Sequence, residues 1–270
     1  MTELFELSML GGAVERRYRR LRPEVETLPW GTLDVTKYSL EVLAIARTTW
    51  TEAAFQEHRT GAACAATLKA LIAARAPLDL IAMATRFPLD EMVHVELCAR
   101  LAMELGGGAP LAHDPLDLIL EPDRKLPALL QAAELVVRNF CVGEALSIPL
   151  LRGSWHAAGH PLIKAVLGRI VKDEAAHGQF GWFFLEWADE QLTASDRTHL
   201  AKQAALTIAA VMERWKTITP LDESQDPERL GWMESASYVA LARKSMQQSV
   251  IAPLGRHGID VVPWLAGMTL

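Results

Sequence analysis

The chain has 270 residues, of which 50% are hydrophobic and 22% are charged, and its net charge at pH 7 is −6. This composition is that of a globular protein with one large or two small domains, and it excludes collagen-like and disordered chains. The acidic charge disfavours a nucleic-acid partner, and no apolar run is long enough for a membrane-spanning helix. Three cysteines without a CxxC pair exclude a disulfide framework and favour a reducing, cytoplasmic location.

The first part of the chain changes from irregular to helical. Residues 1–33 are expected to be an irregular N-terminal segment, with a short basic helix around Val14–Arg22 as an alternative within it. Apolar residues then recur at intervals of three and four, which predicts a long helix over 35–75 with Asp34 as its N-cap. A second helix is predicted over 78–105. Pro88 should kink or split it, because proline lacks the backbone N–H and clashes with the preceding turn.

The rest of the chain is also predicted to be helical, and we find no convincing strand. A kink is expected at Pro149. These patterns predict an all-α protein with a core of four antiparallel helices over 34–190 and a C-terminal helical extension packed on it over 191–270. The predicted elements after the second helix are helices over 127–157, 162–190 and 193–216, a polar loop over 217–228 and a helix over 229–250.

Two copies of one short motif, Asp-Glu-x-x-His, stand at 90–94 and 173–177. Glu and His three residues apart lie on one helical face, so both can reach the same metal ion. With 21 Glu and 8 His, about 0.6 Glu-x-x-His matches are expected by chance, so a single match is uninformative. Two matches that are both preceded by Asp are improbable, on the order of one in a thousand. The repeated motif therefore predicts a metal site.

A lone glutamate is expected on each of the other two core helices, because carboxylate-bridged di-metal bundles combine two such residues with two Glu-x-x-His pairs. In an antiparallel hairpin, residues at equal height are equidistant from the turn. Glu57 and Glu91 have their midpoint at residue 74, beside the turn predicted at 75–77. Glu144 and Glu174 have theirs at Gly159, in the next predicted turn.

Glu52 is the alternative to Glu57. Its midpoint with Glu91 falls at 71–72, inside Ala70-Leu71-Ile72-Ala73, which contains no turn signal. Its helical face also carries Arg59, whereas Glu57 shares a face with apolar residues. The pattern favours Glu57 and leaves Glu52 open.

These residues resemble the ferritin-like di-iron carboxylate superfamily over about 35–190. The resemblance implies a ferritin-like four-helix bundle that holds two iron ions, or a manganese–iron pair, between its helices. Glu91 and Glu174 would bridge the two ions. The metal ligands that the resemblance implies are Glu57, Glu91 and His94 for one ion and Glu144, Glu174 and His177 for the other.

Two aspartates precede the ligand glutamates. A metal-bound imidazole usually donates its other N–H to a carboxylate, which fixes the ring. We expect Asp90 to pair with His177 and Asp173 with His94, a crossing that the resemblance to bacterial di-iron hydroxylases supports. Further residues are predicted to line the core or a substrate cavity beside the metals, namely Trp50, Gly61, Phe140, Cys141 and Gly178.

The resemblance implies an oxygen-activating enzyme, a di-iron oxygenase or oxidase that hydroxylates, N-oxygenates or desaturates a small organic substrate. The sequence has no flavin, haem or iron–sulfur motif, so an external electron donor of ferredoxin or reductase type is expected. None of the three tyrosines falls near the predicted metal level, which disfavours a radical-storing protein. An iron-binding ferroxidase or storage protein and a tRNA-hydroxylase-like enzyme remain alternatives, and a homodimer is left open.

Overall fold

A computed structural model of the chain describes residues 2–216 and 230–266. It confirms the all-α class. In chain order the helical elements are α1 (Gly12–Leu21), α2 (Leu40–Ala73), α3 (Leu78–Glu104), α4 (Ala128–Val136), the π-helical segment η4 (Val137–Glu144), α5 (Ala145–Ala157), α6 (Pro161–Ala188), α7 (Ala194–Trp215), α8 (Ser235–Ser245), the π-helical segment η7 (Met246–Ile251), α9 (Ala252–Arg256) and α10 (Val262–Leu265).

Short elements complete the described chain. The 3₁₀ turns are η1 (Pro23–Thr27), η2 (Val35–Lys37), η3 (Pro115–Leu118) and η5 (Asp189–Gln191). Contrary to expectation, two short strands also form, β1 (Glu3–Leu4) and β2 (Ala112–His113), and they pair antiparallel with Glu3 opposite His113. The loop predicted over 217–228 lies outside the described residues, as does residue 229, where the last long helix was expected to begin.

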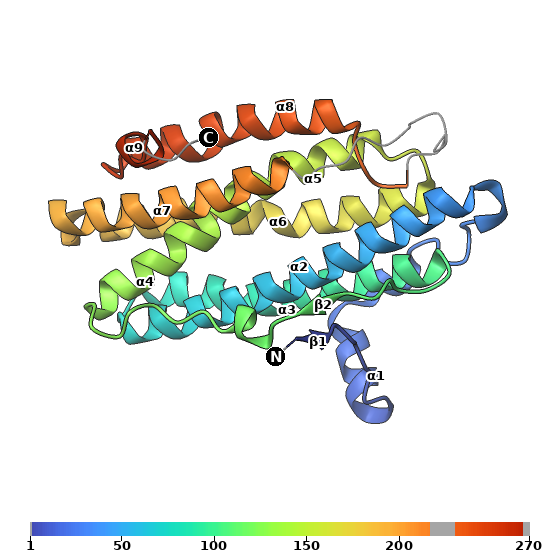
Figure 1. Cartoon of the computed structure of the whole chain (residues 1–270). Coiled ribbons are helices and arrows are strands. Elements are labelled where there is room, and N and C mark those ends of the chain that lie inside the picture. Colours follow the sequence, from blue (N-terminus) through green and yellow to red (C-terminus); the bar gives the residue numbers. More distant parts are fainter. Residues whose placement is uncertain (1, 217–229, 267–270) are drawn as a thin grey trace.

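The long helices α2 and α3 lie side by side and are joined by a short turn (Figure 1). The predicted N-cap Asp34 was wrong for α2. Its carboxylate instead accepts from Thr36 N in η2, and Ser39 Oγ caps α2 by accepting from Val42 N at 3.2 Å. Helix α3 is not split at Pro88, and it runs as one element from Leu78 to Glu104.

The third predicted helix consists of three parts that follow one another without a break. Regular α4 passes into the π-helical segment η4, and α5 continues from it through Pro149. A π-helical segment was not expected from the sequence. Such segments are rare and occur frequently at functional sites. Here the segment ends at Glu144.

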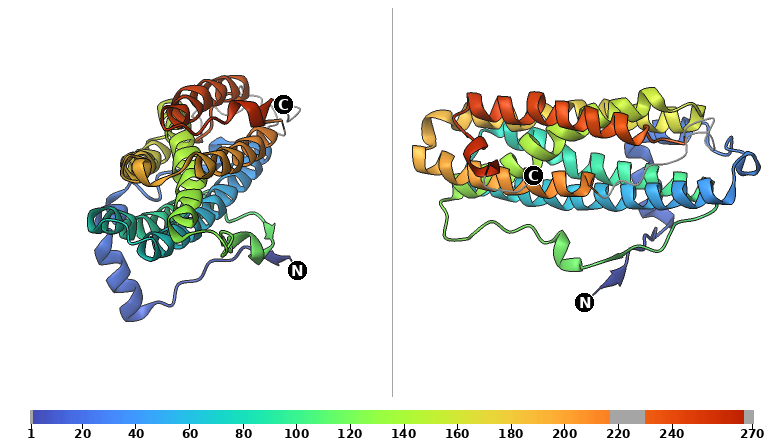
Figure 2. Two further views of the ribbon diagram at one scale, coloured as in Figure 1. Left: turned by 90° about the vertical axis from the view of Figure 1, so that its left-hand side faces the viewer. Right: turned by 45° about the horizontal axis from the view of Figure 1, so that its top comes forward.

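The remaining long helices, α6, α7 and α8, pack against the elements described above. Helix α6 packs against α5, η4 and α3, while α7 lies against α4 and η4 and α8 lies against α5 (Figures 1 and 2). The α5–α6 turn places His160 as the N-cap of α6, where its Nδ1 accepts from Leu162 N. Helix α7 begins with a capping box between Thr193 and Asp196. None of the helices in the described ranges combines the length and apolar character that a membrane span needs.

The core consists of two apolar clusters at different heights along the long helices. One contains Leu71, Phe140 and Phe184, and the other contains Ala46 and Leu101. On each of α2, α3 and α6, charged residues lie near the middle of the helix. Burial of charge is costly unless it is paired or bound to a metal. The position of these charges between two apolar clusters therefore calls for a specific explanation.

Candidate metal centre

Six ionisable side chains from four helical segments meet in the interior. Two groups of ligand atoms form, and within each group all atoms lie within 4.8 Å of one another. Both groups include Glu91 and Glu174, so these two carboxylates lie between them. The first group is Glu57 from α2, Glu91 and His94 from α3 and Glu174 from α6, and the second is Glu91, Glu144 from η4, Glu174 and His177.

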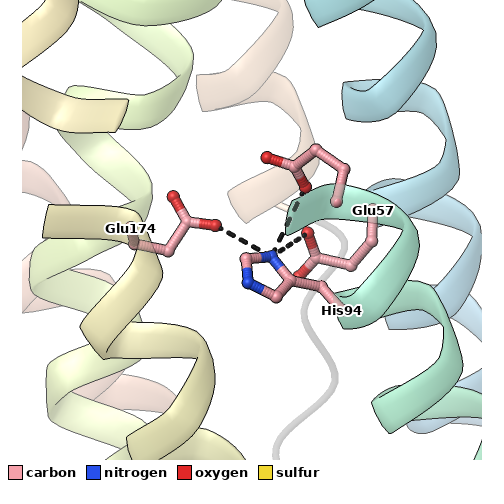
Figure 3. A group of neighbouring side chains, drawn as sticks. Glu57, His94 and Glu174 are labelled. Atoms are coloured by element: carbon pink, nitrogen blue, oxygen red, sulfur yellow. Dashed lines mark ion pairs between the residues drawn. The ribbon is translucent and has the colours of Figure 1, made fainter. Parts of the chain in front are cut away.

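Each imidazole turns its Nδ1 atom towards the carboxylates. His94 Nδ1 lies 3.6 Å from an oxygen of Glu57, 3.5 Å from one of Glu91 and 3.2 Å from one of Glu174. Figure 3 shows Glu57 and Glu174 approaching His94 from different helices. On the opposite side, His177 Nδ1 lies 3.0 Å from Glu91 Oε1 and 3.4 Å from Glu174 Oε2.

The cluster is almost closed to solvent. The exposed fractions of the two histidines and Glu91 are 0%, and that of Glu174 is 2%. Glu57 is the most accessible ligand candidate, with a side-chain exposed fraction of 16%. Five buried polar atoms here have no hydrogen-bond partner, namely both carboxylate oxygens of Glu91, Glu174 Oε2, His94 Nδ1 and His177 Nδ1. Buried polar atoms without a partner are rare in native proteins and indicate a missing ion or water.

Burial and mutual repulsion act strongly on these acids. Burial and the charge of Glu91 raise the pKa of Glu57 to about 8. Burial and the charges of Glu174 and Glu91 raise the pKa of Glu144 well above its ordinary value. The two central carboxylates behave in the opposite way, because the nearby imidazoles outweigh burial and lower the pKa of Glu91 and of Glu174.

The imidazoles hold their protons when no metal is present. Burial alone would lower the pKa of His177, but Asp90, Glu174 and Glu91 outweigh burial and raise it to about 12. The pKa of His94 also lies well above its ordinary value, because nearby glutamates outweigh burial. A pair of divalent cations would replace these protons as the positive charge of the centre.

The two aspartates occupy the positions that the crossed arrangement predicts. His94 Nε2 lies 3.2 Å from Asp173 Oδ2, and His177 Nε2 lies 3.5 Å from Asp90 Oδ2. Each imidazole therefore has a carboxylate behind it and the ligand cluster in front. This is the arrangement in which a protein fixes the tautomer and orientation of a metal-binding histidine.

Of the five residues predicted to line the core or a cavity, Gly178 lines a cavity of about 670 Å³, and the other four are buried in the packing of the helices. Trp50 Nε1 donates to the carbonyl of Leu230 at 2.9 Å. The ring of Phe140 packs edge-to-face against that of Phe180, with ring centroids 4.9 Å apart. The glycines leave room for neighbours, since an added Cβ would lie 2.5 Å from Met92 Cε at Gly61, 2.1 Å from Ile148 Cδ1 at Gly178 and 2.6 Å from Cys141 Sγ at Gly181.

Two outcomes concern residues beyond the six. Glu52, the alternative to Glu57, is exposed and belongs to neither group. Phe87, which sequence reasoning did not single out, packs on the imidazole of His177 with ring centroids 4.4 Å apart. Phe87 lies one helical turn before Glu91, and this spacing alone would have placed it on the same helical face as the predicted ligand.

The donor set fits a pair of transition-metal ions. Four carboxylates and two imidazoles are the hard and borderline donors that suit iron and manganese rather than structural zinc, and no cysteine belongs to either group. The three cysteines are buried and free. No protein-family model, curated protein or solved structure matches the chain.

Proposed function

We propose that the chain is a ferritin-like di-iron oxidoreductase that activates dioxygen to oxidise a small organic substrate. The observation that carries this proposal is the buried cluster of four carboxylates and two imidazoles that belongs to two overlapping groups of ligand atoms. A site with one metal would need only one such group. The sharing of Glu91 and Glu174 between the groups is the feature that supports two neighbouring ions.

In this proposal, Glu57, Glu91 and His94 hold one ion, and Glu144, Glu174 and His177 hold the other. Two ferrous ions bound there would supply electrons for the reduction of dioxygen. The chain's own groups hold and orient the ligands. Asp173 and Asp90 accept hydrogen bonds from Nε2–H of His94 and His177, and Ser147 Oγ lies 3.3 Å from Glu144 Oε2.

The surroundings of the cluster support oxidation of a bound organic molecule better than radical storage. Tyr38 precedes the start of α2 and is 19 residues from Glu57 in the chain. Tyr18 lies outside the core on α1 and donates its hydroxyl to the carbonyl of Met92 at 3.2 Å. Phe87, Phe140 and Phe180 form an aromatic cluster beside His177. Such apolar walls favour a substrate part that is apolar or aromatic.

The test is reaction of the reduced, iron-loaded protein with oxygen. The chain is loaded with Fe²⁺ anaerobically, mixed rapidly with oxygenated buffer and followed by absorbance and oxygen consumption. We expect rapid oxidation by a small oligomer that saturates near two irons per chain. The Glu91→Gln/Glu174→Gln double variant is the matched control. In its presence, Fe²⁺ should be oxidised no faster than in buffer without protein. Uptake of many irons per chain into a large assembly would instead favour iron storage, and equal rates with and without the protein would contradict both functions.

A further inference from the structure

An arginine lies behind each of the two aspartates. Arg86 precedes Asp90 by four residues, and Arg169 precedes Asp173 by four. Both copies of the motif therefore extend to Arg-x-x-x-Asp-Glu-x-x-His. Residues four apart are neighbours on a helix surface, so each arginine can reach its own aspartate.

The structure shows both contacts. Arg86 Nε lies 2.9 Å from Asp90 Oδ2, and its Nη2 lies 3.4 Å from Asp173 Oδ1. Arg169 Nη1 contacts Asp173 Oδ2. Arg169 also donates to Glu24 Oε1 from Nη2 at 2.8 Å and from Nε at 3.0 Å. The N-terminal segment therefore holds Arg169 from outside while Asp173 holds it from within.

The two aspartates are buried, and their exposed side-chain fractions are 8% for Asp90 and 3% for Asp173. A buried carboxylate that meets a guanidinium on one side and an imidazole N–H on the other has few orientations available. Guanidinium groups are suited to this because their donors lie in a rigid plane. The aspartate then accepts a hydrogen bond from Nε2–H, so Nδ1 is the nitrogen that faces the carboxylate cluster and that can bind a metal once it loses its proton.

We infer that Arg86 and Arg169 are positioning residues that hold Asp90 and Asp173 so that His177 and His94 present Nδ1 to the metals. This inference rests on the proposed metal centre. It adds Arg86 on α3 and Arg169 on α6 to the candidate site. Neither arginine is itself a candidate metal ligand, and each acts on a histidine through an aspartate. Because Arg169 is 14% exposed and Arg86 is 61% exposed, the larger effect is expected at Arg169.

A pair elsewhere in the molecule supplies a matched control. Arg138 Nη1 lies 3.3 Å from Glu134 Oε1, again at a spacing of four residues. Glu134 is buried, and its Oε2 lies 2.8 Å from Nε2 of His199 on α7. This set has the same arginine, carboxylate and imidazole chemistry, but His199 belongs to neither group of ligand atoms. A purely structural role of such pairs would affect this set in the same way.

The experiment is titration of the metal-free chain with Co²⁺, whose visible absorption bands report the geometry of its ligands. We expect Arg169→Gln to weaken Co²⁺ binding about tenfold and to shift the absorption bands. Loss of a residue that supports a metal ligand typically costs about 10- to 100-fold in affinity, so this expectation is at the lower end of that range. Arg86→Gln should weaken binding less, and Arg138→Gln should leave affinity and bands unchanged. Arg169→Lys should retain part of the affinity that Arg169→Gln loses, because lysine keeps the charge without the planar fork.

The outcomes distinguish failure of this inference from failure of the proposed metal centre. Wild-type affinity and bands in both Arg169→Gln and Arg86→Gln would overturn the inference while the metal centre stands. An equal loss in Arg138→Gln would also overturn it, since the effect would then be one of general stability. Arg86 is largely exposed, so its variant should fold even if the Arg169 variant does not. Absence of Co²⁺ binding by the unsubstituted chain would overturn the metal centre and the inference together.

Discussion

The two halves of the centre share a motif but differ in what surrounds it. Behind His94, Asp173 lies 3.2 Å away and is backed by the mostly buried Arg169, which the N-terminal segment holds through Glu24. Behind His177, Asp90 lies 3.5 Å away and is backed by an exposed arginine. The His94 half is fixed by a chain of charged groups, whereas the other half relies on aromatic packing.

The lone glutamates of the two halves also differ. Glu57 lies on the regular helix α2 and is the most accessible ligand candidate, while Glu144 ends a π-helical segment and is buried. A repeated sequence motif therefore places the same ligands twice, but it does not dictate equal access or equal support. We expect solvent and small molecules to reach the centre from the Glu57 half.

The largest effect is expected where the two halves meet. The Glu91→Gln/Glu174→Gln variant removes one charge from each carboxylate that both groups share, and we expect it to bind neither ion. Equilibrium dialysis with Fe²⁺ followed by metal analysis measures this. The matched control is Glu52→Gln, an exposed glutamate on α2 that should leave binding unchanged. Retention of both ions by the double variant would show that Glu91 and Glu174 are not shared ligands.

Removal of one imidazole should break one half only. We expect His94→Ala and His177→Ala each to retain one tightly bound ion per chain and to lose the other, because each imidazole belongs to one group. Fe²⁺ stoichiometry by metal analysis checks this. Loss of both ions in both variants would contradict the division into halves and indicate a single shared centre.

Metal binding should stabilise the whole chain, because the ions replace protons among buried acids. At a free Fe²⁺ concentration about 100 times Kd, each bound ion stabilises the fold by about 2.7 kcal/mol, which corresponds to an increase in Tm of about 5 to 10 °C per ion. Thermal unfolding with and without Fe²⁺ under anaerobic conditions measures it. Identical melting curves would count against a buried metal site.

The smallest expected effect is a pair of opposite pH dependences. In the metal-free chain, folding raises the pKa of Glu57 to about 8 and of His177 to about 12, so the folded state binds more protons than the unfolded one. Stability should therefore fall as pH rises from about 6.5 to 8. Metal affinity should rise over the same range, because the ligands must lose those protons.

Denaturant unfolding and Fe²⁺ titration at several pH values test these signs. Glu57→Gln should make the pH dependence of affinity shallower, since it removes one group with a pKa inside the range. Affinity that is independent of pH, or that falls as pH rises, would contradict the assignment of protonated groups to the empty cluster.

The sequence predicted the layout of the centre because helix geometry and turn positions are local properties. The midpoints at residues 74 and 159 fall in the observed gaps between α2 and α3 and between α5 and α6. Equal distance from a turn was therefore enough to bring Glu57 near Glu91 and Glu144 near Glu174.

Other features depend on tertiary contacts and could not be predicted in this way. The π-helical segment before Glu144 changes which residues share a face, and no residue in Val137–Glu144 signals it. Ser39 and not Asp34 caps α2, because the residues after Asp34 form the separate 3₁₀ turn η2. The role of Arg169 depends on Glu24, which is 145 residues away in the chain.

X-ray diffraction at the iron absorption edge from crystals of the Fe²⁺-loaded chain would locate the bound ions. We expect two anomalous peaks between Glu91 and Glu174, one beside Nδ1 of His94 and one beside Nδ1 of His177. A map without a peak at this position, or with iron only on surface acids, would contradict the proposed metal centre.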